Sequence, residues 1–576
     1  MTTTSSAVER SYWPANGLAA LLDFAASSHR RAAAFLVVVS LLFYLPGFFQ
    51  IPPVDRDEAY FAQATKQMIE TGDYIDIRYQ DDVRYRKPIG IYWLQAAVVN
   101  VAQALGLHAA RTTIWLYRVP SLLGAIGAVL ATYWCALAFV TRRGALLAAL
   151  MMSCSILLNV EARLAKTDAV LLFTVVVAMG VLARAYLPRR EKDGAVAEPL
   201  NWPLAAVFWT ALAGGILDKG PLILMVVGFA AVTVSIVERS ARWLKALRPL
   251  SGIVWLCVLV LPWLFAIYLR AGSAFLVDSM GHDMLAKISG GQETHGAPPG
   301  LYVLLFFVTF FPASVLAMLA APAIWTARRE PAAYFLLAWL VPAWIVFELV
   351  PTKLPHYVLP LYPAIAILVA GAIEGNVLSQ RPWLTRLTIW WFIVPILFGV
   401  VAIASTILLD RDLRLAAWPF LAAAIVCGLF AWRLYEVDGV EQSFMRTIAA
   451  ALFAGAGIAD LILPSLAPAF PSAALARVLN NSTCPFPVAA SSGYEEPSLV
   501  FLTGTATRLT DPAGAADFLL RGGCRFAFIE GRQERSFALR AEAIGLRYKA
   551  GPRIEGYNIA NGQRIAVAVF QPAEVP

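Results

Sequence analysis

Three acidic side chains follow the first long apolar segment of the chain. The run LVVVSLLFYLPGFFQIPP is followed directly by Asp55, Asp57 and Glu58. A carboxylate near neutral pH can take a proton from a hydroxyl group and so act as a general base. Asp57 can also cap the predicted helix 58–71, which would end at Gly72. We leave both roles open for Asp57 and expect Asp55 and Glu58 to be solvated or paired with cations.

Basic side chains crowd into the next polar segments. Four of them lie within ten residues: Arg78, Arg84, Arg86 and Lys87. Others lie in three separate segments: Lys219, Lys287, and Lys353 with His356. Cations that converge at a membrane surface suit an anionic group, especially a phosphate. A single arginine is more simply explained by anchoring to lipid headgroups. For the whole set, with carboxylates interleaved, we favour a binding site.

Two further polar features deserve a chemical interpretation. Asp168 begins an apolar run in LAKTDAVLLF, where a carboxylate is costly unless it is paired or functional, and Lys166 is its nearest partner in sequence. His282 and His295 are two of only five histidines, and Asp283 and Glu293 lie near them. These side chains can hold a metal, although their spacing matches no standard motif. A divalent cation is therefore a weak candidate cofactor, and no cofactor is certain.

The composition is that of a polytopic membrane protein. The chain has 576 residues, of which 59% are hydrophobic and only 15% charged. Its net charge of +8 does not require nucleic acid as a partner, because basic loops on the inner side of the membrane account for much of it. The first helix follows Arg30 and Arg31 without a cleavage site, so we expect it to be retained. No nucleotide-binding motif is present, which disfavours a nucleotide-sugar donor.

The positive-inside rule arranges the apolar runs into thirteen membrane spans. They are 32–51, 118–140, 144–161, 168–187, 203–217, 220–238, 250–270, 301–326, 332–350, 356–374, 384–408, 414–434 and 446–466. The apolar segment 89–107 does not fit as a crossing. Gln95, Asn100 and Gln103 fall roughly on one side of it, so we place it in the outer interface with Tyr92 and Trp93 at headgroup level. An ordinary crossing there is the alternative, and it would put the basic clusters outside.

We therefore predict three regions and a helical membrane fold. Residues 1–31 form a cytoplasmic tail, 32–468 a membrane domain whose outer loop 52–117 carries in-plane helices, and 469–576 a small α/β domain outside. In that domain we predict three strands, FPVAAS, SLVFLT and CRFAFIE. We also predict two helices, DPAGAADFLL and RQERSFALRAEAIG, and a hairpin turn at Asn561-Gly562. Cys484 and Cys524 can pair if the domain lies in an oxidising compartment.

Several of these segments, taken in order, resemble one family. They are PVDRDEAYFAQATKQMIETGDYI, RYRKPIGIYWLQA, ARLAKTDA, a KGP turn and KLPHYVLPLYPA. This order is similar to that of bacterial members of the protein O-mannosyltransferase clan, among which the lipid A aminoarabinose transferases are nearest. The resemblance covers most of residues 32–375. It implies the C-type membrane glycosyltransferase fold, with about thirteen transmembrane helices and a periplasmic C-terminal domain.

The resemblance also implies a reaction and roles for particular residues. The reaction is transfer of a sugar from a polyprenyl-phosphate carrier to an envelope acceptor at the periplasmic face of the bacterial inner membrane, with inversion. Asp57 would be the general base and Asp168 a second acid. Lys87 would contact the donor phosphate, and Lys353 and Tyr357 would border it. The convergence of cations, not the resemblance, adds Arg84, Arg86 and Lys287 as phosphate ligands. Other site candidates are Glu58, Lys219, His282, His295 and His356. The family usually has an acid where Arg86 stands, so a metal is more doubtful here.

Two other functions remain as alternatives. A lipid-linked sugar flippase or transporter would place ionisable residues near the bilayer midplane, whereas here they gather in the outer loops. An envelope polymer ligase would share the lipid-phosphate donor. The sequence does not identify the sugar, the oligomeric state, or the acceptor, which can be lipid A, another glycan or lipid, or a protein.

Overall fold

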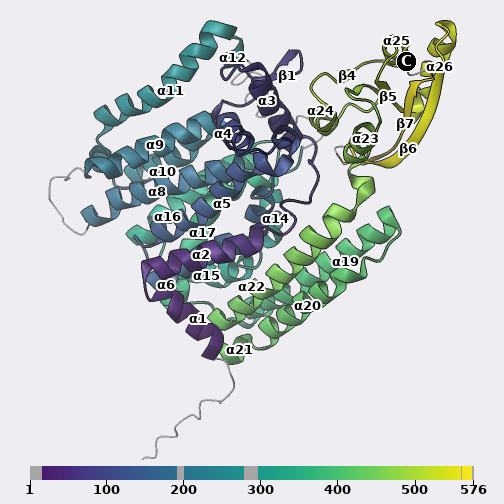
Figure 1. Ribbon diagram of the computed structural model, residues 1–576. Helices are drawn as coiled ribbons and strands as arrows, with labels where there is room; N and C mark the ends of the chain where they lie inside the picture. Colours follow the sequence, from purple (N-terminus) through teal and green to yellow (C-terminus); the bar gives the residue numbers. More distant parts are fainter. Residues whose placement is uncertain (1–15, 191–199, 278–295, 560, 574–576) are drawn as a thin grey trace, which may run out of the picture.

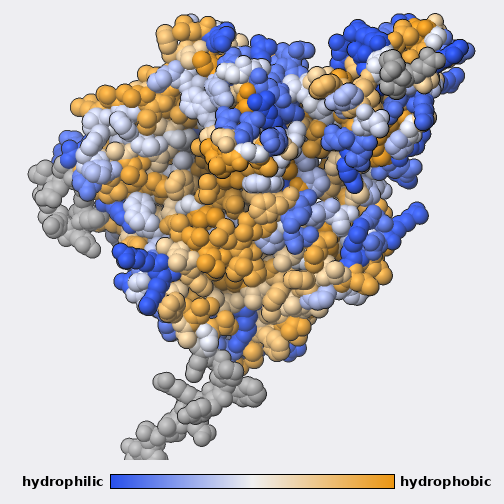
Figure 2. Space-filling model, viewed as in Figure 1, coloured by the Kyte–Doolittle hydropathy of each residue, from blue (hydrophilic) through white to orange (hydrophobic). Residues whose placement is uncertain are grey.

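A helical body and a smaller sheet domain make up the protein (Figure 1). The computed structural model describes residues 16–190, 200–277, 296–559 and 561–573. The helices of the body run side by side, and the sheet domain lies beyond one end of them. Apolar side chains cover the middle of the body, and polar ones gather over the sheet domain and the ends of the helices (Figure 2). This banding is expected of helices surrounded by lipid.

The body consists of helices from both halves of the chain. Its first half contains α1 (Asn16–Ala26), α2 (His29–Tyr44), α5 (Ile114–Ala136), α6 (Arg142–Cys154), α7 (Ile156–Glu161), α8 (Asp168–Arg190), α9 (Trp202–Lys219), α10 (Leu222–Val237) and α11 (Pro249–Ala271). Its second half contains α12 (Ala274–Leu276), α14 (Leu301–Thr309), α15 (Ser314–Thr326), α16 (Pro331–Leu349), α17 (Tyr362–Glu374), α18 (Pro382–Thr385), α19 (Trp390–Asp410), α20 (Trp418–Arg433), α21 (Tyr435–Asp438) and α22 (Val440–Ala456). Helix α1 lies within the stretch predicted as a tail.

Eight helical segments of the described chain are long and apolar enough to cross a membrane. They are Ile114–Ala136, Asp168–Leu187, Pro249–Ala271, Pro331–Leu349, Pro355–Glu374, Pro382–Asp410, Leu415–Arg433 and Val440–Ser465. Shorter apolar helices such as Leu222–Val237 and Ser314–Thr326 accompany them. The helical membrane fold is confirmed, and the count of thirteen spans stays a prediction. The basic pair Arg142 and Arg143 begins α6, at the end of the body far from the sheet domain (Figure 1).

Two short helices and a small hairpin lie at the end of the body that faces the sheet domain. They are α3 (Asp57–Thr71), β1 (Arg78–Tyr79), β2 (Asp82–Val83) and α4 (Gly90–Ala104). Helix α3 ends, as predicted, at Gly72, whose φ of 72° favours glycine. Helix α4 has 15 residues, and at about 1.5 Å per residue it is too short to cross a core of about 30 Å.

Three expectations for these helices are wrong. The sequence pattern predicts an amphipathic helix at 58–71, but α3 has no exposed face over residues 61–69, which are all buried. The expected polar side of α4 is divided: Asn100 is exposed, but the Gln95 amide is buried between the Thr65 hydroxyl and the Ala165 carbonyl. Tyr92 is also fully buried, and only Trp93 beside it is exposed. In each case another part of the chain covers a surface that the sequence pattern assigned to solvent or lipid.

The C-terminal domain is a mixed five-stranded sheet with helices packed against it. Its elements are α23 (Pro471–Asn480), β3 (Val488–Ser492), α24 (Pro497–Thr503), β4 (Arg508–Leu509), α25 (Pro512–Leu520), β5 (Arg525–Glu530), α26 (Glu534–Ala543), β6 (Tyr548–Asn558) and β7 (Gln563–Pro572). The strand order is β4-β3-β5-β7-β6. Strand β3 pairs parallel with β4 and β5, and β7 pairs antiparallel with β5 and β6.

One predicted strand of this domain is a helix. SLVFLT, residues 498–503, forms most of α24, and Pro497 stands in its first turn. Proline suits the first turn of a helix because no intrahelical donor is needed there. Residues 497–501 are all buried, so the short apolar run reflects burial on every side. The other predicted elements form close to their expected positions.

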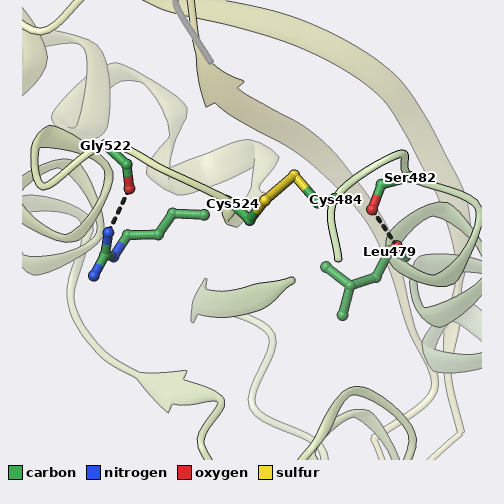
Figure 3. The surroundings of a disulfide bond; sticks show 6 residues. Leu479, Ser482, Cys484, Gly522 and Cys524 are labelled. Atoms are coloured by element: carbon green, nitrogen blue, oxygen red, sulfur yellow. Dashed lines mark hydrogen bonds between the residues drawn. A yellow bond between two sulfur atoms is a disulfide. The ribbon is translucent and has the colours of Figure 1, made fainter. Parts of the chain in front are cut away.

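A disulfide joins the two ends of the β3–α25 part of this domain (Figure 3). Cys484 precedes β3 and Cys524 precedes β5, and their sulfur atoms are bonded. The bond closes a segment with a sequence separation of 40 residues. Such a link stabilises chiefly by restricting the unfolded chain, typically by about 2–4 kcal/mol.

We predict that the double variant Cys484→Ser/Cys524→Ser destabilises the C-terminal domain by about 2–4 kcal/mol. The midpoint of thermal unfolding measures the effect in the detergent-purified protein. Unfolding of the C-terminal domain is detected at each temperature by protease cleavage beyond residue 470. Cys257→Ser is the control, because that cysteine is free and lies on α11. An unchanged midpoint in the double variant would contradict the prediction.

Candidate functional site

Four polar segments that are far apart in sequence meet at the α3 end of the helical body. They are 84–88, 161–168, 217–221 and 353–357. The first and third segments lie against each other at two glycines. A Cβ on Gly90, just after the first segment, would lie 2.7 Å from the carbonyl oxygen of Leu217, and a Cβ on Gly220 would lie 3.9 Å from Pro88. The second and fourth meet through His356, whose ring lies 3.6 Å from Glu161 and 3.7 Å from Asp168. The expected convergence of outer segments is therefore present for these four.

A buried ion pair fixes the start of α3 against this site. The Arg118 guanidinium, on α5, donates to the Glu58 carboxylate from Nε at 2.7 Å and from Nη2 at 2.9 Å. The same carboxylate accepts the backbone N–H of Ala165 at 2.9 Å. Arg118 is fully buried and Glu58 is 2% exposed, so solvent does not screen the pair. Glu58 therefore binds α3, α5 and the 161–168 segment together and does not reach a substrate.

A charged cluster lies beneath that junction. The carboxylate of Asp168 accepts a hydrogen bond from Lys219 and lies 3.6 Å from the Lys166 ammonium. Lys166 also lies 3.4 Å from Glu161. Burial alone would lower the pKa of Lys166, but the negative charges of Glu161, Asp168 and Asp57 outweigh it and raise that pKa. Lys166 therefore stays cationic, and the cluster alternates positive and negative groups.

Asp57 lies at the rim of this cluster with its carboxylate exposed. It is the first helical residue of α3, whereas Arg56 occupies the N-cap position. Within the described part of the chain, no hydrogen bond or ion pair engages the Asp57 side chain. It is near enough to Lys166 and Tyr92 to act on both electrostatically. This arrangement does not give Asp57 the capping role that the sequence left open, and it leaves the carboxylate available to a ligand.

The predicted phosphate ligands fall into two groups. Arg84 is half-buried with its guanidinium 3.9 Å from the centre of the Tyr60 ring, Arg86 is exposed, and Lys87 lies within electrostatic range of His356. Arg84, Arg86 and Asp57 all lie near enough to Tyr92 to act on it electrostatically, so these cations and the Asp57 carboxylate share one region. Three other candidates, Lys287, His282 and His295, lie outside the described residues.

Lys353 has a different role from the predicted one. Its ammonium is buried and donates to the backbone carbonyls of Glu348 and Val350, both at 2.7 Å, at the end of α16. Those orphan carbonyls occupy the cation, so Lys353 stabilises a helix end and does not present its charge to a phosphate. Tyr357, four residues later, does face the cluster, with its ring centre 5.8 Å from the Lys219 ammonium.

Glu161, Asp168 and His356 are the only described group of three or more side chains that could hold a metal ion. Their ligand atoms lie within 4.8 Å of one another, and one oxygen of Glu161 has no hydrogen-bond partner. Lys166 and Lys219 already lie against these carboxylates, however, and a divalent cation would compete with both ammonium groups. The residues present therefore fit a metal poorly, because their carboxylates are already neutralised by the two lysines.

Sequence reasoning missed three buried charges in this region. Glu161 and Asp218 are 3% and 1% exposed, and neither oxygen of Asp218 has a hydrogen-bond partner in the described chain. Arg118 interrupts the apolar run IWLYRVPSLLGA. An ionisable residue within an apolar helix is itself a signal, because it must have a partner. Only the coordinates show that the partner of Arg118 is Glu58.

Asp55 differs from Asp57 in that the C-terminal domain covers it. Its carboxylate accepts the backbone N–H of Ser498 at 2.8 Å and lies 2.6 Å from the Ser498 hydroxyl. Burial raises the pKa of Asp55 to about 7, the Ser498 hydrogen bonds oppose that rise, and the nearby negative charge of Glu496 adds to it. Asp55 therefore changes its charge near neutral pH while it holds α24.

Comparison with known proteins finds one family match and several relatives of moderate identity. Residues 35–276 match the family described as dolichyl-phosphate-mannose-protein mannosyltransferase. The undecaprenyl phosphate-alpha-4-amino-4-deoxy-L-arabinose arabinosyl transferase of Pectobacterium carotovorum is 27% identical over 424 residues, which cover 72% of each chain. A relative of the same name from Pseudomonas aeruginosa is 26% identical over 355 residues, covering 62% of this chain and 61% of that protein.

Solved structures confirm the fold. The apo crystal structure of ArnT from Cupriavidus metallidurans superposes with a TM-score of 0.71 at 18% identity, covering 93% of this chain and 97% of that one. The structure of the same protein bound to undecaprenyl phosphate gives a TM-score of 0.69. The chain therefore shares the fold of ArnT and is similar in sequence to these transferases. The family match over residues 35–276 includes α3, which carries Asp57, and three of the four site segments, 84–88, 161–168 and 217–221.

We predict that Arg118→Met destabilises the protein by about 3–5 kcal/mol, because it leaves the Glu58 carboxylate buried without its counter-charge. Thermal unfolding in detergent measures the loss. Arg564→Gln is the matched control: Arg564 also pairs with a glutamate, Glu555, but the two side chains are 71% and 57% exposed, and such pairs contribute little. Equal effects of the two substitutions would contradict the assigned importance of the buried pair.

We also predict that docking of α24 weakens as the pH rises. Because the pKa of Asp55 is about 7 when docked and about 3.9 when free, docking takes up a proton. The stabilisation is complete below about pH 4 and is lost as the pH rises towards 7. Hydrogen exchange at residues 497–503, corrected for intrinsic rates, should show falling protection from pH 5 to 8. Asp55→Asn should remove this dependence, and pH-independent protection in the unaltered protein would refute the prediction.

Proposed function

We propose that this protein is an inverting glycosyltransferase that moves a sugar from a polyprenyl-phosphate donor to an acceptor in the bacterial cell envelope. It would act in the inner membrane, with its site facing the periplasm. The observation that carries this proposal is the exposed carboxylate of Asp57, which has no partner in the described chain and lies at the rim of the charged cluster. The relatives named above use an undecaprenyl-phosphate sugar, which supports the donor class.

Each half of the site suits one half of the reaction. Asp57 takes the proton of the acceptor hydroxyl as its oxygen attacks the anomeric carbon. The bond from that carbon to the phosphate oxygen breaks, and the polyprenyl phosphate leaves with the electron pair. Lys87, Arg84 and Arg86 stabilise the charge that grows on the departing phosphate. Direct attack inverts the anomeric carbon and needs no covalent enzyme intermediate.

The buried cluster supports this chemistry from below. Asp168 is engaged by Lys219 and Lys166 and so is not free to take a proton from the acceptor. Its negative charge instead keeps the two ammonium groups close together beneath the rim. The relatives suggest 4-amino-4-deoxy-L-arabinose as the sugar and, through the sequence resemblance, lipid A as the acceptor. Another glycan, lipid or protein acceptor would use the same base and cations.

We predict that Asp57→Asn lowers turnover by about 10²- to 10⁴-fold, the usual contribution of a general base. The protein should remain folded, since no described side chain pairs with Asp57. The assay is transfer from an undecaprenyl-phosphate sugar to lipid A, detected by mass spectrometry. Asp81→Asn is the control, because Asp81 is an exposed carboxylate on the same outer segment. Retained turnover in Asp57→Asn would remove it as the base.

We predict that Lys87→Gln weakens donor binding by about 10- to 100-fold, because a charge-assisted hydrogen bond to phosphate contributes roughly 1.5–3 kcal/mol. The donor KM should rise, and undecaprenyl phosphate should inhibit less strongly. Lys549→Gln, an exposed lysine of β6, should change neither. An unchanged donor KM in Lys87→Gln would exclude Lys87 from the phosphate site.

A further inference from the structure

The C-terminal domain covers the helix that carries Asp57. Phe501 of α24 is fully buried in one cluster with Ala62 and Ile69 of α3, and its ring meets Tyr117 edge-on at 5.3 Å. The Lys66 ammonium, 3% exposed in α3, donates to the Phe501 carbonyl at 2.9 Å. A lysine is seldom buried so far without a charged partner. Its position shows that α24 and α3 are packed as one unit.

The turn after α24 continues this contact along α3. Gln63 donates to the Thr505 hydroxyl at 2.8 Å, and that hydroxyl donates to Glu70 at 2.7 Å. Gln80, in the hairpin next to α3, donates to the Thr505 carbonyl at 3.2 Å. Polar contacts therefore extend over two turns of α3, and its rotation or sliding would break several of them together.

A chain of hydroxyl groups fixes the segment that leads into α3. Asp55 lies two residues before Asp57 and is bonded to both the N–H and the hydroxyl of Ser498. The Ser498 hydroxyl also lies 2.6 Å from the Ser472 hydroxyl, which lies 2.8 Å from that of Tyr494. One hydroxyl donates a single proton, so Ser498 donates to Asp55 when Ser472 donates to Ser498 and Tyr494 donates to Ser472. Ser472 and Ser498 are 3% and 1% exposed, which keeps water from replacing these bonds.

We propose that the C-terminal domain is a positioning element of the transfer site, and that Ser498, through Asp55, sets the position of the Asp57 carboxylate. The proposal rests on the transferase function given above. Helix α3 contacts the membrane body through Glu58 and the C-terminal domain through Lys66. Asp55, in the segment just before α3, makes a second contact with the C-terminal domain. Asp57 stands between Asp55 and Glu58 in sequence, and its own side chain is held by neither. The two anchors therefore determine where its carboxylate points.

The proposal distinguishes a positioning residue from a catalytic one. Asp55 and Ser498 face each other and do not lie at the exposed rim with Asp57. Their loss should displace the base and leave the donor phosphate ligands of the 84–88 segment in place. A small displacement of a reacting group is enough to lower a rate by about 100-fold. Turnover should therefore fall while the donor KM remains the same.

The test compares Ser498→Ala and Asp55→Ala with two conservative variants in the full-length protein. Ser498→Ala retains the backbone bond to Asp55 and should fold. We expect both alanine variants to lower kcat by about 10- to 100-fold with a donor KM within about twofold of the unaltered protein. Ser498→Thr retains the hydroxyl, and Asp55→Asn can replace both hydrogen bonds, so these two should restore most of kcat. Hydrogen exchange in α3 should increase only in the alanine variants.

Ser482→Ala is the matched control. Ser482 also lies in the C-terminal domain, but its hydroxyl donates to the Leu479 carbonyl close to the disulfide and not to α3 (Figure 3). Its kcat and exchange should be unchanged. The proposal is overturned if both alanine variants keep kcat within twofold, or if threonine and asparagine fail to restore it. The Asp57→Asn variant tests the proposed function separately. Full turnover in that variant would show that Asp57 is not the base, whereas unchanged kcat in Ser498→Ala and Asp55→Ala would show that the contact does not position it.

Discussion

The ion pair between Glu58 and Arg118 is the interaction on which the rest of the site depends. It is buried, bidentate and shared with the backbone of Ala165, so one carboxylate fixes three segments at once. Its Coulomb energy is large in a medium of low dielectric, and so is the cost of leaving either partner alone. The pair places Asp57 directly above the charged cluster, because Asp57 precedes Glu58 in the first turn of α3.

Two kinds of carboxylate therefore lie within four residues of each other in sequence, and their partners determine what each can do. Glu58 has an arginine and a backbone amide, and Asp55 has a serine of the C-terminal domain. Asp57 has neither kind of partner among the described residues. The same logic separates the lysines: Lys219 and Lys166 balance the buried acids, and Lys353 neutralises the end of α16. Lys87 is only half-buried and acts on His356 electrostatically. Identical residue types thus serve structure or chemistry according to what surrounds them.

The sequence predicted much of the fold because the bilayer restricts what an apolar run can be. Long apolar segments and basic loops indicated a multi-pass helical protein, and the order of the polar motifs indicated the family. Periodicity failed where a surface was covered by a distant part of the chain. Residues 498–503 have the short apolar pattern of a strand, and α3 has the pattern of an amphipathic helix. Both patterns mislead for the same reason, because α24 and α3 pack against each other and bury surfaces that the pattern assigns elsewhere. Lys353 was misplaced because no local pattern shows that a lysine side chain folds back onto carbonyls.

The order of synthesis gives the contact between α3 and α24 a further consequence. The two partners stand near opposite ends of the polypeptide, at residues 57–71 and 497–503. A ribosome finishes the first long before it starts the second, and the disulfide that braces the later domain also joins residues made late, Cys484 and Cys524. A nascent or prematurely terminated chain can thus insert its early helices while its base stays unsupported. Under the proposed positioning role, the protein gains full activity only once its last domain has folded against α3.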